Sequence, residues 1–355
     1  MKRIIISTGG TGGHVIPAQV FYDYLANKNK VIITSDSRGI NYIDKKKYKN
    51  KQIHVPKICK NIISYIPFLI SFTLSIIKSY FYLRKNKTEI LISTGGYMSV
   101  PFCIAAKILN LKIFLFEPNL VLGRANLFLL NYCNKIFTYS KKIKNLPNQM
   151  KHKIIQIKPL IKKEIFLSKI KPVKKKNEFS ILIIGGSQSA KSFDSLFSED
   201  LTKLSQKFKL KIFHQTSHKN IKMLRNFYVS KKIKIQIFSY TTNLHKVIKK
   251  CDFVITRSGS STINELIFLE TPFLAIPFPF SKDDHQYFNA KYFVEKKFGW
   301  LIRESEIRKN FLYKFIMNLI KNKRILMQKK NNMSKFHKDF SWYGNLKNLE
   351  DVIKK

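Results

Sequence analysis

Acidic residues and cysteines are scarce in this 355-residue chain, and each shortage excludes a class of protein. Only 21 Asp and Glu stand against 66 Lys and Arg, which leaves a formal net charge of +45. The four cysteines (Cys59, Cys103, Cys133 and Cys251) form no C-x-x-C pair. This argues against a zinc site or a disulfide framework and fits a reducing compartment. Because the N-terminal apolar run is too short for a signal peptide, we expect a cytoplasmic location.

The positive charge has two explanations. Lys, Ile, Asn and Phe are abundant along the whole chain, as an AT-rich genome would produce, and we take this bias as the main cause. The other explanation is a polyanionic partner, either nucleic acid or an anionic membrane. Basic motifs with interleaved aromatic residues are absent, so we expect no nucleic-acid partner. Spread positive charge still attracts anionic lipid.

Short β-rich runs alternate with longer helical stretches, and several runs are continuously apolar. Such runs are typical of strands buried on both faces of a parallel sheet. The pattern restarts near residue 179, after the polar linker candidate Ile170–Glu178, so we expect two Rossmann-like, doubly wound α/β domains that face a cleft. The domains should span 1–165 and 178–335, and 336–355 should be a helix that packs back on the first. The expected strands are Arg3–Thr8, Val31–Thr34, Ile90–Ser93, Lys112–Phe116, Lys135–Tyr139, Phe179–Ile184, Lys211–His214, Lys234–Phe238, Phe253–Thr256 and Phe273–Ile276.

Small-residue turns follow four of the expected strands. Glycine lets backbone N–H groups approach a phosphate, and the N-terminus of the next helix adds a partial positive charge. Any single βα unit can need glycine for a tight turn, but four turns shared between both halves favour a nucleotide-sugar site. The turns are Gly9–His14, Gly95–Tyr97, Gly185–Gln188 and Arg257–Thr262.

Two better-known phosphate motifs are not matched. Val15 replaces the third glycine of a dinucleotide fingerprint, although Asp36 could mimic its ribose acid, and Ala190 replaces the P-loop glycine before Lys191. The chain has no D-x-D to chelate a metal–diphosphate. We therefore expect no metal and no cofactor, with positive helix ends that stabilise the leaving group.

Six motifs, in order along nearly the whole chain, resemble those of the MurG family of UDP-N-acetylglucosamine transferases, which are glycosyltransferases of the two-Rossmann-domain B type. They are GGTGGHVIPA (9–18), STGGYMSVP (93–101), FEPN (116–119), GGSQ (185–188), RSGSSTINE (257–265) and DDHQYFNA (283–290). The resemblance implies transfer of GlcNAc from UDP-GlcNAc, with inversion, to the muramoyl 4-hydroxyl of lipid I (undecaprenyl-diphosphate-MurNAc-pentapeptide). The product is lipid II for peptidoglycan synthesis, and hence for cell shape and division.

The resemblance also implies roles for single residues. In the first half, His14 is our first choice as general base and Glu117 is its rival, while Asn119 should bind GlcNAc hydroxyls and Tyr97 either lines the acceptor entrance or only packs. The residues that should line the diphosphate and sugar are Thr11, Gly12 and Gly13. In the second half, Ser187 should bind the diphosphate, Glu265 the ribose and Gln286 the sugar. The N–H donors of that half should be Ser260, Ser261 and Thr262.

Three positions depart from the family pattern. Ile161 occupies the place of a family arginine, for which Lys162 or Lys163 is a substitute without the bidentate fork. Ser189 replaces a glycine, and His285 stands where some relatives have a second glutamine.

An apolar segment, Ile62–Leu83, lies within Lys45–Thr88, which has eleven Lys or Arg and no acidic residue. It can be a core helix, a spanning helix or an interfacial helix, and the flanking cations favour the last. The acceptor of the resembled family carries a polyprenyl tail. We therefore expect a peripheral protein on the anionic cytoplasmic face of a bacterial inner membrane.

Two other functions remain open. One is a different nucleotide-sugar enzyme of the same fold, such as a soluble glycosyltransferase or a UDP-sugar epimerase, and the apolar segment argues against it. The other is a nucleic-acid-binding protein without enzymatic activity, suggested only by the charge.

Overall fold

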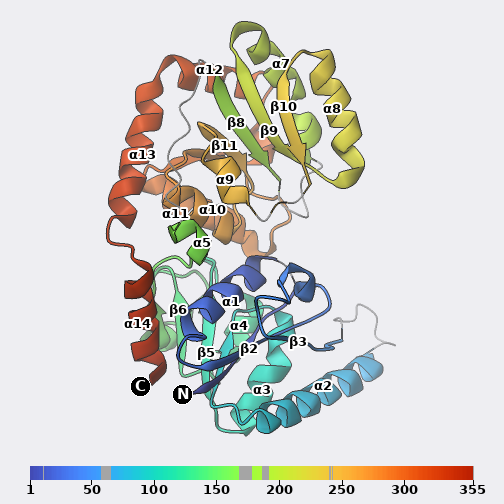
Figure 1. Ribbon diagram of the computed structural model, residues 1–355, viewed down its shortest axis with the longest axis vertical. Coiled ribbons are helices and arrows are strands. Elements are labelled where there is room, and N and C mark those ends of the chain that lie inside the picture. Colours follow the sequence, from blue (N-terminus) through green and yellow to red (C-terminus); the bar gives the residue numbers. More distant parts are fainter. Residues whose placement is uncertain are drawn as a thin grey trace. The chain divides into compact units, whose positions relative to one another are not determined.

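The computed structural model describes residues 1–10, 12–56, 65–167, 178–185, 192–239, 241 and 243–354. The chain forms two compact units, Met1–Phe166 with Phe340–Lys355, and Leu167–Asp339. Each unit is built on one parallel sheet with helices against it (Figure 1). Nearly all of the expected linker, Ile170–Glu178, lies outside the described residues.

The sheet of the first unit has seven strands in the order β3-β2-β1-β4-β5-β6-β7, and all of its pairings are parallel. The run Ile4–Ile6 in β1 is almost fully buried, as expected for a central strand covered on both faces. The strands are β1 (Arg3–Ser7), β2 (Lys30–Ser35), β3 (Asn50–Gln52), β4 (Ile90–Ser93), β5 (Lys112–Glu117), β6 (Lys135–Thr138) and β7 (Ile154–Gln156).

The helices of the first unit include one from the far end of the chain. Trp342 of α14 stacks on Tyr24 with ring centroids 4.0 Å apart, and Glu350 pairs with Lys28 at 3.0 Å. Leu349 and Ile353 are buried in the same core as β1. The helices are α1 (Gly12–Leu25), α2 (Tyr65–Lys85), α3 (Val100–Ile108), α4 (Arg124–Leu129), α5 (Lys163–Leu167, at the boundary) and α14 (Trp342–Lys354).

The sheet of the second unit has six parallel strands in the order β10-β9-β8-β11-β12-β13. The strands are β8 (Phe179–Ile184), β9 (Leu210–Gln215), β10 (Lys234–Phe238), β11 (Phe253–Thr256), β12 (Phe273–Ala275) and β13 (Gly299–Leu301). The helices are α7 (Ser198–Lys207), α8 (Ile221–Ser230), α9 (Leu244–Ile248), α10 (Ser260–Phe268), α11 (His285–Glu295), α12 (Phe311–Lys321) and α13 (Lys323–His337).

All ten expected strands are present, and the expected α/β class is confirmed. Three further strands, β3, β7 and β13, were not predicted from the sequence. Each has three residues and pairs with only one neighbour, β2, β6 or β12 respectively. A short edge strand needs no long apolar run, so it leaves little signal in the sequence.

The two topologies gather the expected motifs at strand ends. In the first sheet β1, β4 and β5 are neighbours, and in the second β8, β11 and β12 are neighbours. Five of the six motifs directly follow these strands in the sequence, although residues 11 and 186–188 lie outside the described part, and the sixth (283–290) begins in the loop after β12 and continues into α11. Ligands of open α/β sheets bind at the carboxyl ends of strands, where the winding reverses.

Helix α2 packs against α3 with one face and exposes an apolar face on the other side. Ser75, Ser79 and Leu83 are buried, whereas Ile66 is 69% and Ile70 is 58% exposed. Among the described residues, α2 is the one helix long and apolar enough to cross a membrane. Only 17% of its apolar 18-residue stretch is buried inside the structure. A core helix would be covered, so the core alternative is excluded. The first residues of the expected segment, 62–64, lie outside the described part.

Candidate functional site

The loop after β1 is held by Asp36, at the end of β2. One carboxylate oxygen of Asp36 accepts the N–H of Gly10 at 2.7 Å and the N–H of Gly39 at 2.9 Å. A Cβ atom on Gly9 would lie 2.8 Å from that oxygen and 2.8 Å from Cβ of Met98, so only glycine fits. Asp36 therefore fixes the loop and is not placed as the ribose acid of a dinucleotide site.

The charge of Asp36 is stabilised by these contacts. Burial raises the pKa of its carboxyl, but the N–H groups of Gly10 and Gly39 and the guanidinium of Arg38 outweigh burial and leave the pKa below its ordinary value. At pH values above the ordinary carboxyl pKa, hydrogen bonding to the charged carboxylate therefore stabilises the loop. This stabilisation is lost as the pH falls through the lowered pKa of Asp36.

His14 lies in the first turn of α1 and bonds to the loop after β4. Its Nδ1 is 2.9 Å from the carbonyl oxygen of Thr94. Gly95 and Gly96 have φ values of +89° and +84°, and a Cβ atom on Gly95 would lie 3.2 Å from Nδ1. The two glycines therefore let the ring lie against the backbone. Because a carbonyl can only accept, the neutral ring carries its proton on Nδ1, which leaves the lone pair on Nε2.

Glu117, at the end of β5, is 2% exposed and has four hydrogen-bond donors. Oε1 accepts the N–H and the side-chain Nδ2 of Asn119, both at 3.0 Å. Oε2 accepts the N–H of Gly123 and Nδ2 of Asn126, both at 2.9 Å. Both carboxylate oxygens are thus used inside the protein, and one of these bonds orients the Asn119 amide.

Asn126, in α4, was missed by the sequence analysis. Its side chain is 2% exposed and also donates to the carbonyl oxygen of Phe116 at 3.1 Å. A Cβ atom on Gly95 would lie 3.5 Å from Nδ2 of Asn126 as well as beside His14. The His14 turn and the Glu117 network are therefore neighbours across Gly95. Spacing along the chain gave no signal for this link.

In the second unit, α10 begins without a side-chain cap at Gly259. Ser260, Ser261 and Thr262 form its first turn, and all three are half-buried. Glu265, half-buried, lies in the next turn. The N–H groups of a first helical turn have no partner within the helix, so this end suits an anion.

Gln286, in the first turn of α11, has its oxygen fixed by two backbone donors. Oε1 accepts the N–H of Ser258 at 3.2 Å and the N–H of Phe278 at 3.0 Å. Because both neighbours are donors, the side-chain oxygen must face them. The Nε2 group then points away from these two donors. Gln286 thereby joins the turn after β11 to the loop after β12.

Arg257 connects more segments around this turn than any residue the sequence analysis chose. Its Nη1 donates to the carbonyl oxygens of Ile276 at 3.2 Å and Pro277 at 3.0 Å. Its Nη2 donates to Oγ of Ser192 at 2.5 Å and lies 2.6 Å from a carboxylate oxygen of Glu304. The side chain is only 5% exposed. Arg257 thus holds the helical segment that contains Ser192 together with the loops after β12 and β13.

Two aromatic rings complete the surroundings of Arg257. The guanidinium carbon lies 4.3 Å from the ring centre of Phe193 and 5.6 Å from that of Phe278. Burial lowers the pKa of the guanidinium, and the ion pair with Glu304 opposes this effect. A lone arginine directly after a buried strand was the signal in the sequence that could have identified this residue.

The other expected residues fall as follows. Gly12 and Gly13 begin α1, and Tyr97 lies in the short 3₁₀ turn after Gly96, where its ring stacks 5.7 Å from that of Phe72. Ile161, at the place of the family arginine, is 1% exposed. Thr11, Ser187 and Ser189 lie outside the described residues. Within the described part of the chain, no three His, Cys, Asp or Glu side chains are grouped to hold a metal ion.

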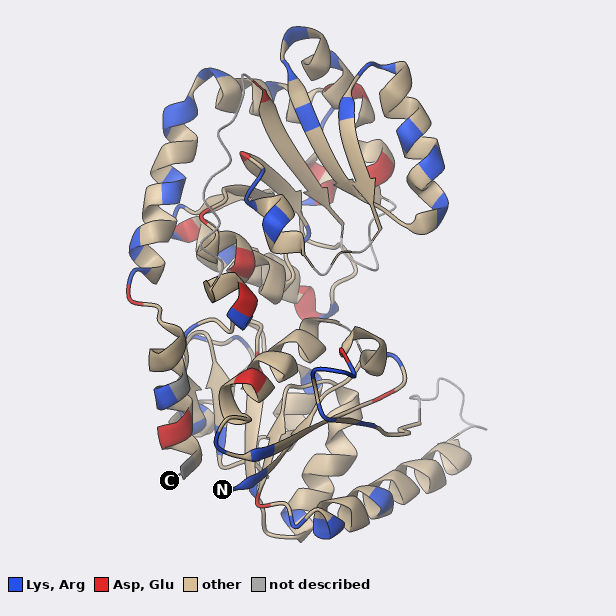
Figure 2. Ribbon diagram, viewed as in Figure 1, with Lys and Arg blue, Asp and Glu red and all other residues tan. Residues whose placement is uncertain are grey.

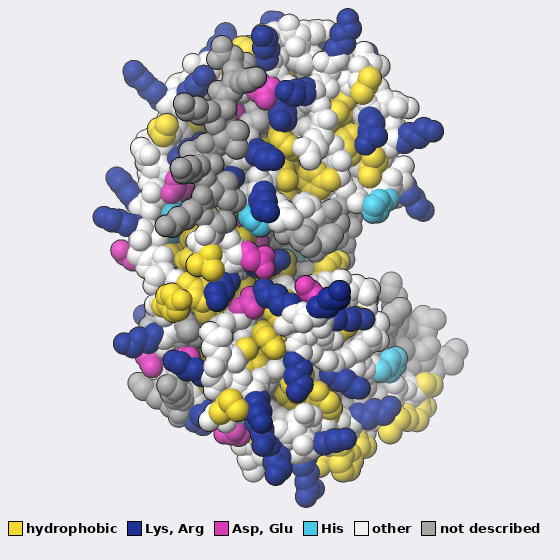
Figure 3. Space-filling view, viewed as in Figure 1, with side chains coloured by type: hydrophobic (Ala, Val, Ile, Leu, Met, Phe, Trp, Pro, Cys, Tyr) yellow, Lys and Arg dark blue, Asp and Glu magenta, His cyan; other side chains and the backbone are white. Residues whose placement is uncertain are grey.

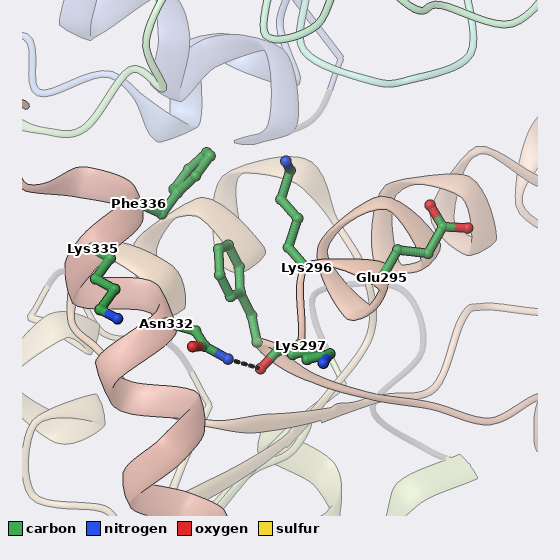
Figure 4. A pocket seen from close by; sticks show the side chains of 7 residues that line it. Glu295, Lys296, Lys297, Asn332, Lys335 and Phe336 are labelled. Atoms are coloured by element: carbon green, nitrogen blue, oxygen red, sulfur yellow. Dashed lines mark hydrogen bonds between the residues drawn. The ribbon is translucent and has the colours of Figure 1, made fainter.

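A surface hollow of about 450 Å³ lies away from all these residues, between the end of α11 and α13 (Figure 4). The ammonium group of Lys296 lies 4.9 Å from the ring centre of Tyr292 and 5.6 Å from that of Phe336, so cation–π contacts hold it in place. The hollow is lined by Glu295, Lys296, Lys297, Phe298, Asn332, Lys335 and Phe336. None of these lining residues is among the expected site residues.

Two family models match the chain. The glycosyltransferase family 28 N-terminal domain matches residues 4–138, and the glycosyltransferase family 28 C-terminal domain matches residues 180–342. A protein of Pelagibacter ubique is 44% identical over 342 residues, which is 96% of each chain. One of Rickettsia canadensis is 32% identical and covers 99% of this chain and 100% of its own. Both are named UDP-N-acetylglucosamine–N-acetylmuramyl-(pentapeptide) pyrophosphoryl-undecaprenol N-acetylglucosamine transferase.

Solved structures agree on the fold. MurG of Acinetobacter baumannii superposes with a TM-score of 0.76 at 21% identity, over 100% of this chain and 99% of its own. HepE of Anabaena in complex with UDP superposes with a TM-score of 0.70 at 10% identity, over 100% of both chains.

Proposed function

Because this chain belongs to glycosyltransferase family 28, we propose that it transfers GlcNAc from UDP-GlcNAc to the muramoyl 4-hydroxyl of lipid I, and so forms lipid II. The observation that carries this function is the 44% identity, over 96% of both chains, to a relative named for this transfer. The motif turns at neighbouring strand ends support it, because they supply an acceptor-side histidine and an uncapped helix N-terminus.

The direct test is transfer of labelled GlcNAc from UDP-GlcNAc to a lipid I analogue by the purified protein. We expect a labelled disaccharide on the diphosphate lipid, together with release of UDP. Label on a small soluble alcohol alone would instead support a soluble glycosyltransferase. Epimerised sugar without any transfer would support an epimerase.

The reaction is a single displacement. The muramoyl 4-oxygen attacks the anomeric carbon of GlcNAc, and the bond from that carbon to the diphosphate breaks, so that UDP leaves with the electron pair and the anomeric configuration inverts. The proton of the hydroxyl passes to a base. Nε2 of His14 is suited to accept it, because the Thr94 carbonyl holds the ring proton on Nδ1. Glu117 already accepts four donors, and this favours a positioning role for it over that of base.

On the donor side, the first turn of α10 provides N–H groups and a partial positive charge for the UDP diphosphate. Ser187 is a second residue that we assign to the diphosphate. Gln286 donates from Nε2 to a sugar hydroxyl, since its oxygen is held by two backbone N–H groups. Glu265 accepts from the ribose hydroxyls, one turn further along α10. Asn119, whose side-chain amide donates to Glu117, is the residue we assign to the GlcNAc hydroxyls.

Substitution of Glu265 tests the ribose role. Glu265→Ala should weaken UDP-GlcNAc binding about 10- to 100-fold, because hydrogen bonds to a charged group are lost, whereas kcat at saturating donor should change little. Calorimetric titration with UDP-GlcNAc measures the affinity. Glu270→Ala is the matched control, since Glu270 follows the same helix but pairs with His337 at 3.2 Å. Unaltered donor affinity in Glu265→Ala would refute the assignment.

The exposed face of α2 supports a further proposal, peripheral binding to the anionic cytoplasmic face of an inner membrane. We define the apolar face as Ile66, Leu69, Ile70, Leu74 and Ile77, each between 44% and 69% exposed. Figure 3 shows hydrophobic side chains gathered along α2, and in Figure 2 this helix carries few charges, with Arg84 and Lys85 in its last turn. Since the opposite face packs on α3, the helix suits the membrane surface better than a span.

The double variant Ile66→Ser/Ile70→Ser should lower binding to vesicles with anionic lipid about tenfold or more, because apolar surface no longer enters the lipid. Co-sedimentation with vesicles measures this. Val229→Ser on α8, at a site 63% exposed, is the control and should bind as the wild type does. Equal binding by the double variant and the wild type would contradict the membrane role of α2.

A further inference from the structure

Four aromatic rings form a continuous row between α2 and the turn after β4. The ring centroids are 6.2 Å apart for Tyr65 and Phe68, 5.8 Å for Phe68 and Phe72, and 5.7 Å for Phe72 and Tyr97. Phe68 also lies 6.5 Å from Tyr97. These separations are within the range of direct ring contacts. Residues 65, 68 and 72 share one face of the helix, so the row follows the helix and then passes to another segment of the chain.

The two ends of the row have different surroundings. At one end, Tyr65 is 56% exposed and stands next to Ile66 of the apolar face. At the other end, Tyr97 directly follows Gly96, and the Gly95–Gly96 pair packs against the ring of His14. The row therefore begins beside the surface proposed to meet lipid and ends at the residue that follows the glycine pair in contact with the proposed base.

Phe68 stands apart from the buried residues by which α2 joins the described core cluster. The buried contacts of the helix are made by Ser75, Ser79 and Leu83, and Phe72 and Tyr97 pack partly against the same core. Among the described residues, Phe68 is not part of that core cluster, and its ring lies against the other three rings of the row. Phe68 is half-buried, so part of its apolar surface is available to a ligand.

We propose that this aromatic row binds the first isoprene units of the acceptor's polyprenyl chain. The proposal rests on the proposed function, since it concerns the acceptor of the same reaction. The muramoyl sugar of the acceptor must reach the base, and the far end of its polyprenyl chain lies in the lipid bilayer. Between these positions, the first isoprene units would meet water unless an apolar path covers them. The row supplies such a path, with flat ring faces against which the planar double bonds of an isoprenoid can lie.

The experiment uses the full chain in solution without vesicles or detergent, and two soluble acceptors that carry the muramoyl-peptide diphosphate. One acceptor has a two-isoprene chain and the other has a hydroxyethyl group in its place. The variants are Phe68→Leu and Phe68→Leu/Phe72→Leu, which keep apolar volume but remove the rings. The matched control is Phe81→Leu on the same helix, since Phe81 is 61% exposed and its ring lies apart from the row.

We expect the double variant to raise KM for the prenyl acceptor about tenfold, as loss of ring contacts of this kind implies. Its KM for the hydroxyethyl acceptor and for UDP-GlcNAc should stay within about twofold of the wild type. Phe68→Leu should show part of the effect, and Phe81→Leu should show none. Thermal melting of each variant checks the fold, and Phe68→Leu alone keeps the test valid should the Phe72 change destabilise α2.

Two results would overturn the inference. In the first, KM for the prenyl acceptor is the same in the wild type and in Phe68→Leu. In the second, KM rises equally for both acceptors, which would mean that the rings only shape the turn around Tyr97. Failure of the proposed function looks different, because the wild type would then transfer GlcNAc to neither acceptor.

Discussion

His14→Ala should lower kcat about 10²- to 10⁴-fold, the range that a positioned general base contributes, while KM for UDP-GlcNAc changes little. The reason is geometric. The Thr94 carbonyl accepts from Nδ1, so the lone pair on Nε2 is the one basic position that the ring can offer a substrate hydroxyl. Steady-state transfer of labelled GlcNAc to a soluble acceptor, at varied donor and acceptor concentrations, separates the two constants.

His152→Ala is the matched control for this experiment. His152 lies in the same unit, and its Nδ1 bonds to a backbone carbonyl, that of Gln149, at 2.8 Å. It differs in being exposed and in lying beside the amino ends of β6 and β7, whereas the motif turns follow the carboxyl ends of strands, so its loss should leave kcat unaffected. If His14→Ala retained the kcat of the wild type, His14 would be removed from the mechanism. The base would then have to be sought among other acceptor-side groups.

Arg257→Met should destabilise the second unit by about 3 kcal/mol, the lower end of the cost of breaking a buried ion pair. The lower end applies because the side chain of Glu304 is 25% exposed and can be partly hydrated. The same change should raise KM for UDP-GlcNAc, since the helical segment at Ser192 and the loops after β12 and β13 lose their common partner. Denaturant titration and donor kinetics measure the two effects.

Arg303→Met provides the comparison for Arg257. Arg303 also pairs with a carboxylate, that of Asp284, at 2.6 Å, but its side chain is 43% exposed, so its loss should cost about 1 kcal/mol or less. Adding Glu304→Gln to Arg257→Met should restore part of the stability, because the uncompensated charge is removed. Equal stability of Arg257→Met and the wild type would show that the guanidinium does not organise the donor-side loops.

The sequence predicted the sheets well because central parallel strands leave an unambiguous pattern. Strands such as Phe179–Ile184 are buried throughout and apolar at every position except Ser180, and the small-residue turns mark where they end. The edge strands Asn50–Gln52 and Gly299–Leu301 were not predicted. Each has three residues and pairs with one neighbouring strand, so neither needs a continuous apolar run. The alternation of strands and helices predicts parallel sheets, whose carboxyl ends lie at one edge, whereas the order of the strands came from the structure.

The hydrogen-bond networks could not be predicted in the same way. Glu117 was considered as a base, yet its four donors come from Asn119, Gly123 and Asn126. Arg257 reaches Ser192 across 65 positions and Glu304 across 47. Such partners meet only after the sheet has formed, and no local pattern of residues announces them. A carboxylate in a motif therefore identifies a polar position, and only the fold shows whether its oxygens are already used.

The last helix has a practical consequence for dissecting the molecule. Because Trp342, Leu349 and Ile353 fill the core around Tyr24, the first unit is made from both ends of the chain. A gene fragment that stops at Phe166 would lack the α14 side chains that complete its core, and it would expose apolar surface to solvent. A fragment that begins at Leu167 would carry α14 with its apolar face exposed. To express the first unit alone, residues 340–355 would have to be fused to Met1–Phe166 or added as a separate peptide.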